Sequence, residues 1–388
     1  MDKNFPVRKI AENQVENELC SIGFDSSYLD IAKNKFIGNL FKISHLTPVQ
    51  ATILKQTALS CGTDCAVHRD VLTQNIEYSD VILFATNSQI KEIIKKLSPQ
   101  PFKLNILAQN LETAAQDTFS KFTIRNKIFN SEKTYIMGIL NCTPNSFSDG
   151  GEFFNENNAL KRFNDIITQG ADIVDIGAES TAPFNDAISA DEEINRLKDV
   201  LKKCREQNTD IPISIDTRNA LTAKLALDLD ADIINDVSGF IYDKKMAEIV
   251  ANANAYAILT FDDEINSEKT IDETVKGLLK RIELGEKAGL SPEKIIIDPG
   301  LGFRKTFEQN FEIIKRADEI CSLGFPVLYG LSRKSFVQKI TGLKPKETLC
   351  ANISLASYLA QKGVRILRVH DVLEHKIAFR ALDKVLYD

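Results

Sequence analysis

The amino-acid sequence predicts an α/β protein, a (β/α)8 TIM barrel preceded by a small α/β amino-terminal domain. Three observations favour this fold. From Ile139 onward, short apolar segments alternate with longer amphipathic ones, which is the pattern of repeated β/α units around a parallel sheet. The alternation repeats eight times over about 250 residues, the usual size of such a barrel. Polar residues follow many different strands, as expected when the active site lies at the carboxyl ends of the strands.

The smaller domain is expected over residues 1–125 and the barrel over residues 126–388, because an unpatterned connection precedes the first barrel strand. In the smaller domain, residues 47–50 (Thr-Pro-Val-Gln) predict a capping box with proline at the first helical position. Residues 81–84 predict a buried strand, and Ser88 is expected to cap the next helix. This accessory domain shows no catalytic constellation, so its role stays open.

The barrel strands are expected at eight apolar segments that lead into polar residues or glycine. These segments are residues 135–141, 171–177, 211–217, 231–237, 255–261, 294–300, 325–332 and 364–372. Helices are expected between them. In residues 158–169, for example, Phe163 and Ile166 belong to one apolar stripe, and Gly170 ends the helix. An open doubly wound sheet is the alternative, but it usually has a G-x-G-x-x-G turn after its first strand, which this chain lacks.

Composition limits the classes of function. The chain has 388 residues, of which 43% are hydrophobic, and a net charge of -6. This charge argues against nonspecific binding to nucleic acid or to an anionic membrane, so small-molecule substrates are expected as partners. The chain lacks an apolar run of membrane-spanning length, and its polar start lacks the features of a secretion signal. A cytoplasmic location is therefore expected. The sequence leaves the oligomeric state open, with a homodimer as one expectation.

Seven cysteines form an odd count without a regular disulfide framework. Cys61 and Cys65 are the only close pair, and with His68 they suggest a metal corner as an alternative. Because a second ligand pair does not follow them, reduced and mostly buried thiols are the favoured interpretation.

The segment at residues 138–151 (GILNCTPNSFSDGG) is the strongest functional signal. An apolar strand leads into a loop crowded with hydroxyls, amides and a carboxylate, as in an active-site loop. This loop resembles the first loop of the dihydropteroate synthase family. Similar motifs follow at later strand ends in the family's order. They are GAEST at 177–181, SIDT at 214–217, INDV at 234–237, DPGLGF at 298–303, GLSRKSF at 330–336 and RVHDV at 368–372. Together they identify the carboxyl-terminal domain as similar to this family. The amino-terminal domain is similar to extensions that some bacterial members carry, a weaker resemblance that implies no defined activity.

A pterin presents a planar donor-acceptor edge, so its pocket needs a carboxylate and an amide inside an apolar slot. Asp216, Asn235 and Asp298 each end an apolar strand, and the resemblance implies that all three bind the pterin. The alternative is that Asp216 and Asn235 only cap the helices that follow. Phe303 is expected to form a wall of the slot, with ordinary packing as its alternative.

The resemblance also implies a pyrophosphate site. Its expected residues are Asn141, Thr181, Arg368 and His370, with Mg2+ as cofactor held at Asn141. For Arg368 the alternative is an exposed salt bridge at a strand end.

The remaining implied roles concern p-aminobenzoate and catalysis. Lys334 is expected to contact both the pterin and p-aminobenzoate, and Arg333 to brace the loop. The p-aminobenzoate site is expected to contain Phe147, Pro183 and Ser335, and the catalytic set Asp149, Lys334, Arg368 and His370.

The implied activity is that of a transferase of folate biosynthesis. It joins p-aminobenzoate to the methylene carbon of 6-hydroxymethyl-7,8-dihydropterin pyrophosphate and releases pyrophosphate. An arylamine is already neutral and nucleophilic at pH 7, so a strong base is unnecessary. A pterin-dependent methyltransferase is the first alternative, but it has no use for the cations of the GLSRKSF and RVHDV motifs. A noncatalytic pterin-binding paralogue is the second alternative.

Departures from the family pattern favour that second alternative. Asn145 stands where an acidic residue is usual. Ala182 and Phe184 replace the usual arginine and glycine around Pro183. Residues 259–261 (Leu-Thr-Phe) lack the usual Met-His pair. These departures bear on p-aminobenzoate recognition and on sensitivity to sulfonamides more than on pterin binding.

Overall fold

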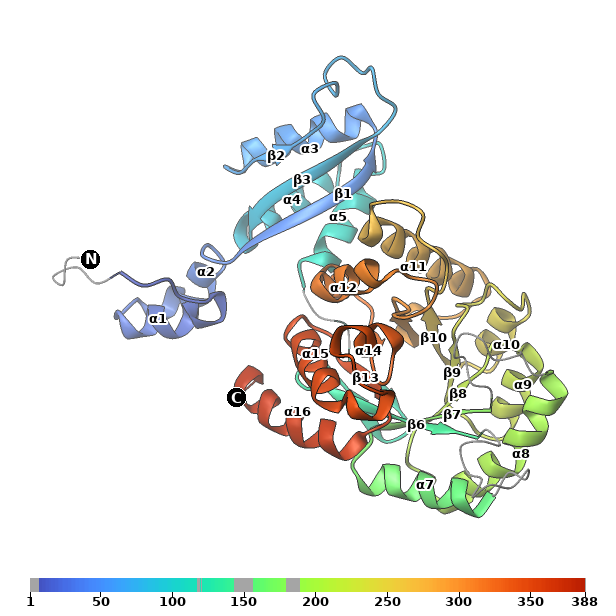
Figure 1. Cartoon of the computed structure of the whole chain (residues 1–388). Coiled ribbons are helices and arrows are strands. Elements are labelled where there is room, and N and C mark those ends of the chain that lie inside the picture. The colour runs from blue at the N-terminus through green and yellow to red at the C-terminus, as the bar shows by residue number, and fades with distance from the viewer. Residues whose placement is uncertain (1–6, 117–118, 120, 143–155, 179–188, 388) are drawn as a thin grey trace. The chain divides into compact units, whose positions relative to one another are not determined.

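The computed structural model describes residues 7–116, 119, 121–142, 156–178 and 189–387. The chain divides into two compact units, Met1–Asp117 and Thr118–Asp388 (Figure 1). Each unit has a hydrophobic core of its own. In the described part of the chain, none of the helices combines the length and the apolar composition that crossing a bilayer requires.

The amino-terminal unit is an α/β module. Strands β1 (Gly38–Leu46), β3 (Ser79–Thr86) and β2 (Cys65–Ala66) pair antiparallel in the order β1-β3-β2. The helices are α1 (Val15–Ser21), α2 (Leu29–Lys33), α3 (Pro48–Ser60), α4 (Asn87–Leu97) and α5 (Leu104–Ala114), with 3-10 turns at Glu12–Gln14 and Ser26–Tyr28. The exposed and buried residues of β3 alternate, so residues 81–84 bury only one face of the strand rather than both.

Capping residues set the starts of two helices in this unit. The predicted capping box before α3 is confirmed, with Thr47 and Gln50 each bonding the other's backbone. The prediction for α4 was wrong by two residues. Thr86, not Ser88, is the cap, because Thr86 forms a second capping box with Gln89. Thr86, the last residue of β3, therefore caps α4, and the helix begins at the next residue.

A short hairpin, β4 (Phe122–Ile124) and β5 (Lys127–Phe129), belongs to the second unit. Phe122 stacks on Phe129, with ring centroids 4.9 Å apart, and both rings lie in one cluster with Tyr135 and Tyr256 from the barrel strands. The expected boundary between residues 125 and 126 falls between the two strands of this hairpin. The hairpin stays with the barrel because its aromatic side chains fill the barrel's amino-terminal end.

Eight parallel strands form the barrel, in the order β11-β10-β9-β8-β7-β6-β13-β12. They are β6 (Tyr135–Asn141), β7 (Ile173–Gly177), β8 (Ile213–Asp216), β9 (Ile233–Asp236), β10 (Tyr256–Thr260), β11 (Ile295–Asp298), β12 (Leu328–Gly330) and β13 (Ile366–Val369). A bridge between Ile297 and Val327 joins the two ends of the sheet. The predicted (β/α)8 fold is confirmed, and each strand lies within its expected range.

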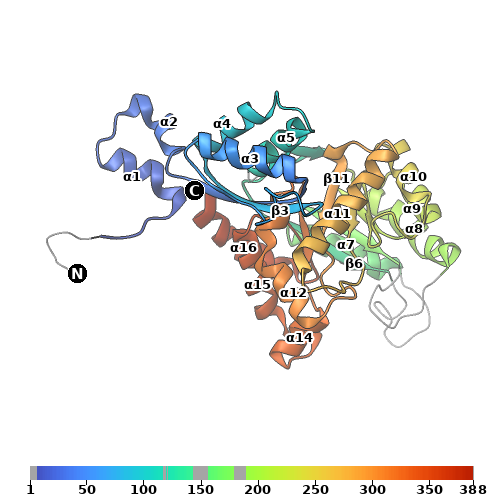
Figure 2. The same ribbon diagram turned by 90° about the horizontal axis from the view of Figure 1, so that it is seen from above.

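Helices surround these strands (Figures 1 and 2). They are α7 (Glu156–Thr168), α8 (Ala190–Gln207), α9 (Ala220–Asp228), α10 (Met246–Asn252), α11 (Thr270–Lys287), α12 (Phe307–Lys315), α13 (Ala317–Cys321), α14 (Ser335–Thr341), α15 (Leu349–Gln361) and α16 (Val372–Tyr387), with 3-10 turns at Pro292–Lys294 and Pro345–Glu347. Val174 and Ile234 belong to the large core between strands and helices, whereas Ile173, Ile233 and Ile296 belong to the cluster inside the barrel. Alternate residues of each strand therefore face the two cores.

The cysteines are free thiols. Cys65, Cys142 and Cys204 are buried, but Cys20 and Cys350 are exposed. The expectation of mostly buried thiols thus holds for only part of the set.

Candidate active site

A polar layer lies inside the barrel above the apolar one. Because side chains of a strand alternate, the residue two positions after each interior isoleucine also faces the interior. Those positions hold Asp175 in β7, Asn235 in β9, Thr260 in β10, Asp298 in β11 and Arg368 in β13. In β8, Ser214 and Asp216 occupy the interior positions, since Ile213 and Ile215 face the helices. The carboxyl ends of the strands thus gather the polar groups at one end of the barrel.

Arg368 connects two carboxylates of this layer. Its Nε donates to Asp175 Oδ2 and its Nη2 to Asp216 Oδ2, both at 2.6 Å. Burial opposes the charged guanidinium, but the two carboxylates hold the pKa of Arg368 above its ordinary value. Burial raises the pKa of Asp216, and Arg368 opposes that rise. Arg368 is therefore an interior cation, and the alternative of an exposed strand-end salt bridge is wrong.

Asn235 also bonds across the barrel. Its Nδ2 donates to Asp175 Oδ2 at 3.2 Å. Neither Asp216 nor Asn235 caps a helix, since the residue before α9 is Asn219 and the residue before α10 is Lys245. The helix-cap alternative for these two residues is therefore wrong.

Three buried oxygens of this layer lack a hydrogen-bond partner among the described residues. They are Asp175 Oδ1, Asp216 Oδ1 and Ser214 Oγ. A buried polar atom without a partner costs about 1–3 kcal/mol. The layer therefore has acceptors that a ligand's N–H groups would satisfy.

Asp298 ends β11 and turns back to the loop that follows it. Its Oδ1 accepts from the Gly300 N–H at 2.8 Å. Burial raises the pKa of Asp298, whereas this hydrogen bond and the cations Lys334, Lys305 and Arg368 lower it. Asp298 is thus a buried carboxylate in a field of positive charge.

Lys334 precedes α14 and lies over the Phe303 ring, with 4.2 Å from its Nζ to the ring centroid. Burial lowers the pKa of Lys334 to about 8, and Arg368 lowers it as well, while Asp298 and Asp216 act in the opposite direction. The structure thus brings Lys334 and Phe303 together beside the polar layer. Phe303 is half-buried, so part of its surface remains available to a ligand.

His370 follows β13 and is held by Ser332. Its Nδ1 lies 3.0 Å from Ser332 Oγ, and its backbone N–H donates to the same oxygen at 3.3 Å. Burial and the neighbouring arginines lower the pKa of His370 to about 3, so the ring is neutral at pH 7. If Ser332 donates its proton to Nδ1, the His370 Nε2 carries the hydrogen and faces away from that bond.

The other residues of this segment differ in exposure. Arg333 Nη2 donates to Asp371 Oδ1 at 2.9 Å, which joins the loop before α14 to the end of β13. Ser335, the first residue of α14, is exposed. The bracing role expected for Arg333 agrees with this contact.

Asn141 ends β6 opposite Gly177 of β7 and is half-buried. Its carboxamide oxygen is a ligand type that Mg2+ accepts. The described residues contain no group of three or more His, Cys, Asp or Glu side chains arranged for a metal ion. A Mg2+ ion held here would take this one protein oxygen and complete its coordination with phosphate and water.

Several expected site residues lie outside the described residues. They are Phe147, Asp149, Thr181 and Pro183, together with the departures Asn145, Ala182 and Phe184. The third departure is described. Thr260 faces the barrel interior, and Phe261 packs outward on α11.

Sequence reasoning missed Asp175 and Lys305. The signal for Asp175 was a carboxylate inside an otherwise apolar strand, which requires a cation partner once it is buried. Lys305 gave no comparable signal, because a lysine in a loop is usually solvated.

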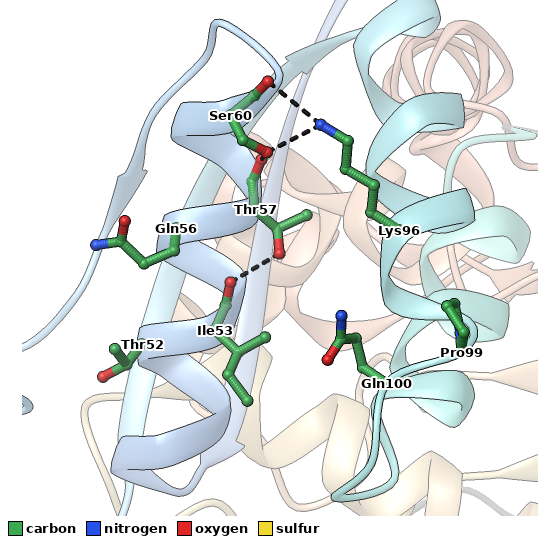
Figure 3. Close-up of a pocket in the computed structure, with 8 residues that line it drawn as sticks. All are labelled: Thr52, Ile53, Gln56, Thr57, Ser60, Lys96, Pro99 and Gln100. Carbon is green, nitrogen blue, oxygen red and sulfur yellow. Dashed lines mark hydrogen bonds between the residues drawn. The ribbon is translucent and has the colours of Figure 1, made fainter.

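A separate groove lies in the amino-terminal unit between α3 and α4 (Figure 3). It is lined by Thr52, Ile53, Gln56, Thr57, Ser60, Lys96, Pro99 and Gln100. Lys96 donates to the Ser60 hydroxyl at 2.9 Å and to its carbonyl oxygen at 3.3 Å. The cation is thus occupied within the groove, and none of the expected site residues lies there.

Comparisons with known proteins concern mainly the barrel. Residues 137–370 match the family described as pterin binding enzyme. A dihydropteroate synthase of Clostridium beijerinckii is 40% identical over 266 residues, which cover 68% of this chain and 98% of that protein. A solved dihydropteroate synthase of Clostridium difficile, obtained in the presence of pteroic acid, is 42% identical. It covers 66% of this chain and 98% of its own, with a TM-score of 0.64.

One relative extends beyond the barrel. A probable bifunctional folylpolyglutamate synthase/dihydropteroate synthase of Haloferax volcanii is 35% identical over 350 residues, or 85% of this chain and 41% of that protein. Because the barrel unit holds only residues 118–388, this alignment also covers part of the amino-terminal unit.

Proposed function

Because the chain belongs to the dihydropteroate synthase family of pterin-binding enzymes, it makes dihydropteroate, and we propose that it does so at the polar layer of the barrel. The observation that carries this proposal is the group of buried carboxylates beside Arg368 and Lys334. Two of these carboxylates have an oxygen without a hydrogen-bond partner among the described residues. A pterin offers ring and amine N–H groups to such oxygens.

The pterin slot is proposed to contain Asp216, Asn235 and Asp298 as hydrogen-bonding groups and Phe303 as its wall. Lys334 Nζ lies over the Phe303 ring, and its cation would reach a carbonyl oxygen of the pterin. Charged partners make these hydrogen bonds stronger than neutral ones, by roughly a factor of two. Such a slot would select the donor pattern of the pterin and hold the ring in one orientation.

The pyrophosphate is proposed to lie toward Asn141, Arg368 and His370. Arg368 Nη1 has no bond to a described residue, so it can donate to a phosphate oxygen. His370 is neutral and would act as an N–H donor rather than as a cation. Mg2+ held at Asn141 would neutralise charge on the departing pyrophosphate. Thr181 is expected to add a hydroxyl.

The chemical step then needs little acid-base assistance from the chain. The arylamine of p-aminobenzoate is a neutral nucleophile, and Lys334 with Arg368 favours the negative charge that develops on the leaving group. Ser335 at the exposed start of α14 is proposed to meet the p-aminobenzoate carboxylate, with Phe147 and Pro183 beside it. Asp149 is proposed as a further catalytic residue. A homodimer and a cytoplasmic location also remain proposals.

A pyrophosphate-release assay tests the function. Release should require both 6-hydroxymethyl-7,8-dihydropterin pyrophosphate and p-aminobenzoate, and it should fall when EDTA removes Mg2+. The metal should also be needed for tight binding of the pyrophosphate-bearing pterin but not of the free pterin alcohol. Pterin binding without release would support the noncatalytic paralogue. Methyl transfer in place of release would support the methyltransferase.

A further inference from the structure

The amine of Lys305 joins two loops at the mouth of the barrel. Its Nζ donates to the Phe261 carbonyl oxygen at 2.7 Å and to the Phe303 carbonyl oxygen at 3.2 Å. Phe261 follows β10, whereas Phe303 lies in the loop after β11. A single side chain therefore ties together the ends of two neighbouring strands.

The Phe261 end of this link is rigid. Its N–H donates to the Asp298 carbonyl oxygen at 2.9 Å, and its ring centroid lies 4.6 Å from Lys305 Nζ and 5.0 Å from Arg281 Cζ. Gly277 leaves the space for this ring, because a Cβ there would lie 2.2 Å from Phe261 Cε2. Arg281 is fully buried. Phe261 thus offers Lys305 a fixed anchor.

The Phe303 end carries groups of the proposed pterin slot. Lys334 Nζ lies over the Phe303 ring, and Asp298, the last residue of β11, directly precedes the same loop. At Gly302, a Cβ would lie 3.0 Å from Lys334 Cδ, so the loop and the lysine stem are in close contact. A shift of the Phe303 backbone would therefore move both the wall of the slot and its cation.

We propose that Lys305 is a positioning residue for the pterin site, which holds the Phe303 loop against the end of β10 so that Phe303 and Lys334 are in place before the ligand arrives. The inference rests on the proposed function and deepens it. Lys305 acts through Phe303 and is assigned no contact with the reacting atoms. Preorganisation of this kind raises affinity by removing the cost of ordering the loop at the moment of binding.

The surroundings of Lys305 favour a hydrogen-bonding role over a charge role. Burial, with a smaller effect of Arg281, lowers the pKa of Lys305 to about 7. The carboxylates of Asp298, Asp262 and Asp263 act in the opposite direction. Both the charged and the neutral amine carry enough N–H groups for two carbonyl acceptors. The link therefore persists on either side of pH 7.

The test uses the full chain and titrates it calorimetrically with 6-hydroxymethyl-7,8-dihydropterin, well below the melting temperature of every variant. Lys305→Met removes the donors at similar length and should raise the pterin Kd about tenfold, on the scale of a small misplacement in a site. Lys305→Gln is a second variant that cannot reach both carbonyls and should also weaken binding. Lys305→Arg keeps donors and should restore most of the affinity.

Lys294→Met is the matched control, because Lys294 lies over the Tyr256 ring (4.2 Å) at the opposite end of β11. It should leave the pterin Kd unchanged. In steady-state kinetics Lys305→Met should raise the KM for the pterin substrate by a larger factor than it lowers kcat, since Lys334 is displaced but Arg368 and His370 are untouched. A wild-type Kd in both Lys305→Met and Lys305→Gln, with only a lower melting temperature, would make the residue merely structural and overturn the proposal. Failure of the wild-type protein to bind the pterin would overturn the proposed function and this inference with it.

Discussion

Arg368 is the residue on which the charge balance of the site depends, since it is bonded to two buried carboxylates. Arg368→Gln leaves Asp175 and Asp216 without their cation and should lower the free energy of unfolding by about 3–5 kcal/mol. Adding Asp216→Asn should recover part of that loss, because one uncompensated charge disappears. Urea unfolding measures both changes.

The control for this prediction is Arg333→Gln. Arg333 and Asp371 form a partly exposed pair, so the loss should be about 1 kcal/mol or less. If Arg368→Gln cost no more than Arg333→Gln, the interior pairing would contribute nothing to the fold.

His370 gives the site a pH dependence that can be measured without substrate. Its pKa is about 3 in the folded chain and about 6.5 when exposed, so below pH 6.5 the unfolded chain binds a proton that the folded chain does not. Stability from this group is complete above pH 6.5 and should fall by up to about 1.4 kcal/mol per pH unit toward pH 3. The free energy of unfolding of the wild-type protein should therefore fall more between pH 7 and pH 5 than that of the His370→Asn variant. Parallel pH profiles for the two proteins would contradict the neutral histidine.

Individual residues of the site were predictable to different degrees. Asp298 and Arg368 could be placed because strand ends of a (β/α)8 barrel meet at one mouth. Their partners could not be predicted. Asp216, for example, could either cap a helix or form a contact across the barrel, and the outcome depends on which strands are adjacent. Lys305 escaped prediction because the direction of a long side chain in a loop is set by tertiary contacts.

Helix α11 contains two glycines that should respond in opposite ways. At Gly277 a Cβ would meet the Phe261 ring at 2.2 Å, whereas at Gly285 the nearest atom is Leu290 Cδ2 at an ordinary 3.5 Å. Gly277→Ala should destabilise the barrel by about 1–3 kcal/mol through overpacking. Gly285→Ala should stabilise it by about 0.5–1 kcal/mol, the helix propensity of alanine over glycine. Thermal unfolding would refute the proposed packing of Phe261 if both substitutions had the same effect.

The elements themselves were the most predictable level. Strands buried on both faces read as short apolar runs, and the helices between them keep an apolar stripe, so each barrel strand fell within its expected range. The start of α4 was misplaced because Ser88 and Thr86 are both good caps, and only the capping box with Gln89 distinguishes them. Strand β3 was expected to be fully buried because its exposed positions, Ile82 and Phe84, are apolar.

At the scale of the molecule, the hairpin β4–β5 decides where the chain can be cut. A chain beginning at Thr118 keeps the hairpin and should retain both a cooperative barrel and pterin affinity. A chain beginning at Asn126 loses Phe122 and Ile124, each worth about 1.5–3 kcal/mol of burial, and should melt at a clearly lower temperature. Calorimetric melting compares the two. Equal melting temperatures would show that the hairpin is not part of the barrel core.

The two-unit organisation was predictable from the change in pattern along the chain, but its border was not. The sequence between the units has no strong periodicity, and the short hairpin strands give a weak signal. The likeness of part of the amino-terminal unit to the Haloferax volcanii protein shows that such a segment recurs with this kind of barrel.

The claim that the polar layer binds the pterin is tested most directly by measuring the affinity for the free pterin alcohol in three proteins. These are the wild type, Asp298→Asn and Asp172→Asn. Asp298→Asn should weaken binding by about 2–4 kcal/mol, because a buried charge-assisted pair with the pterin is lost. Asp172→Asn is the control, since Asp172 is an equally buried carboxylate that binds Lys127 and Lys376 near the amino-terminal end of β7. It should leave the affinity at the wild-type value. Unchanged affinity in Asp298→Asn, or an equal loss in both variants, would contradict a pterin site at the carboxyl ends of the strands.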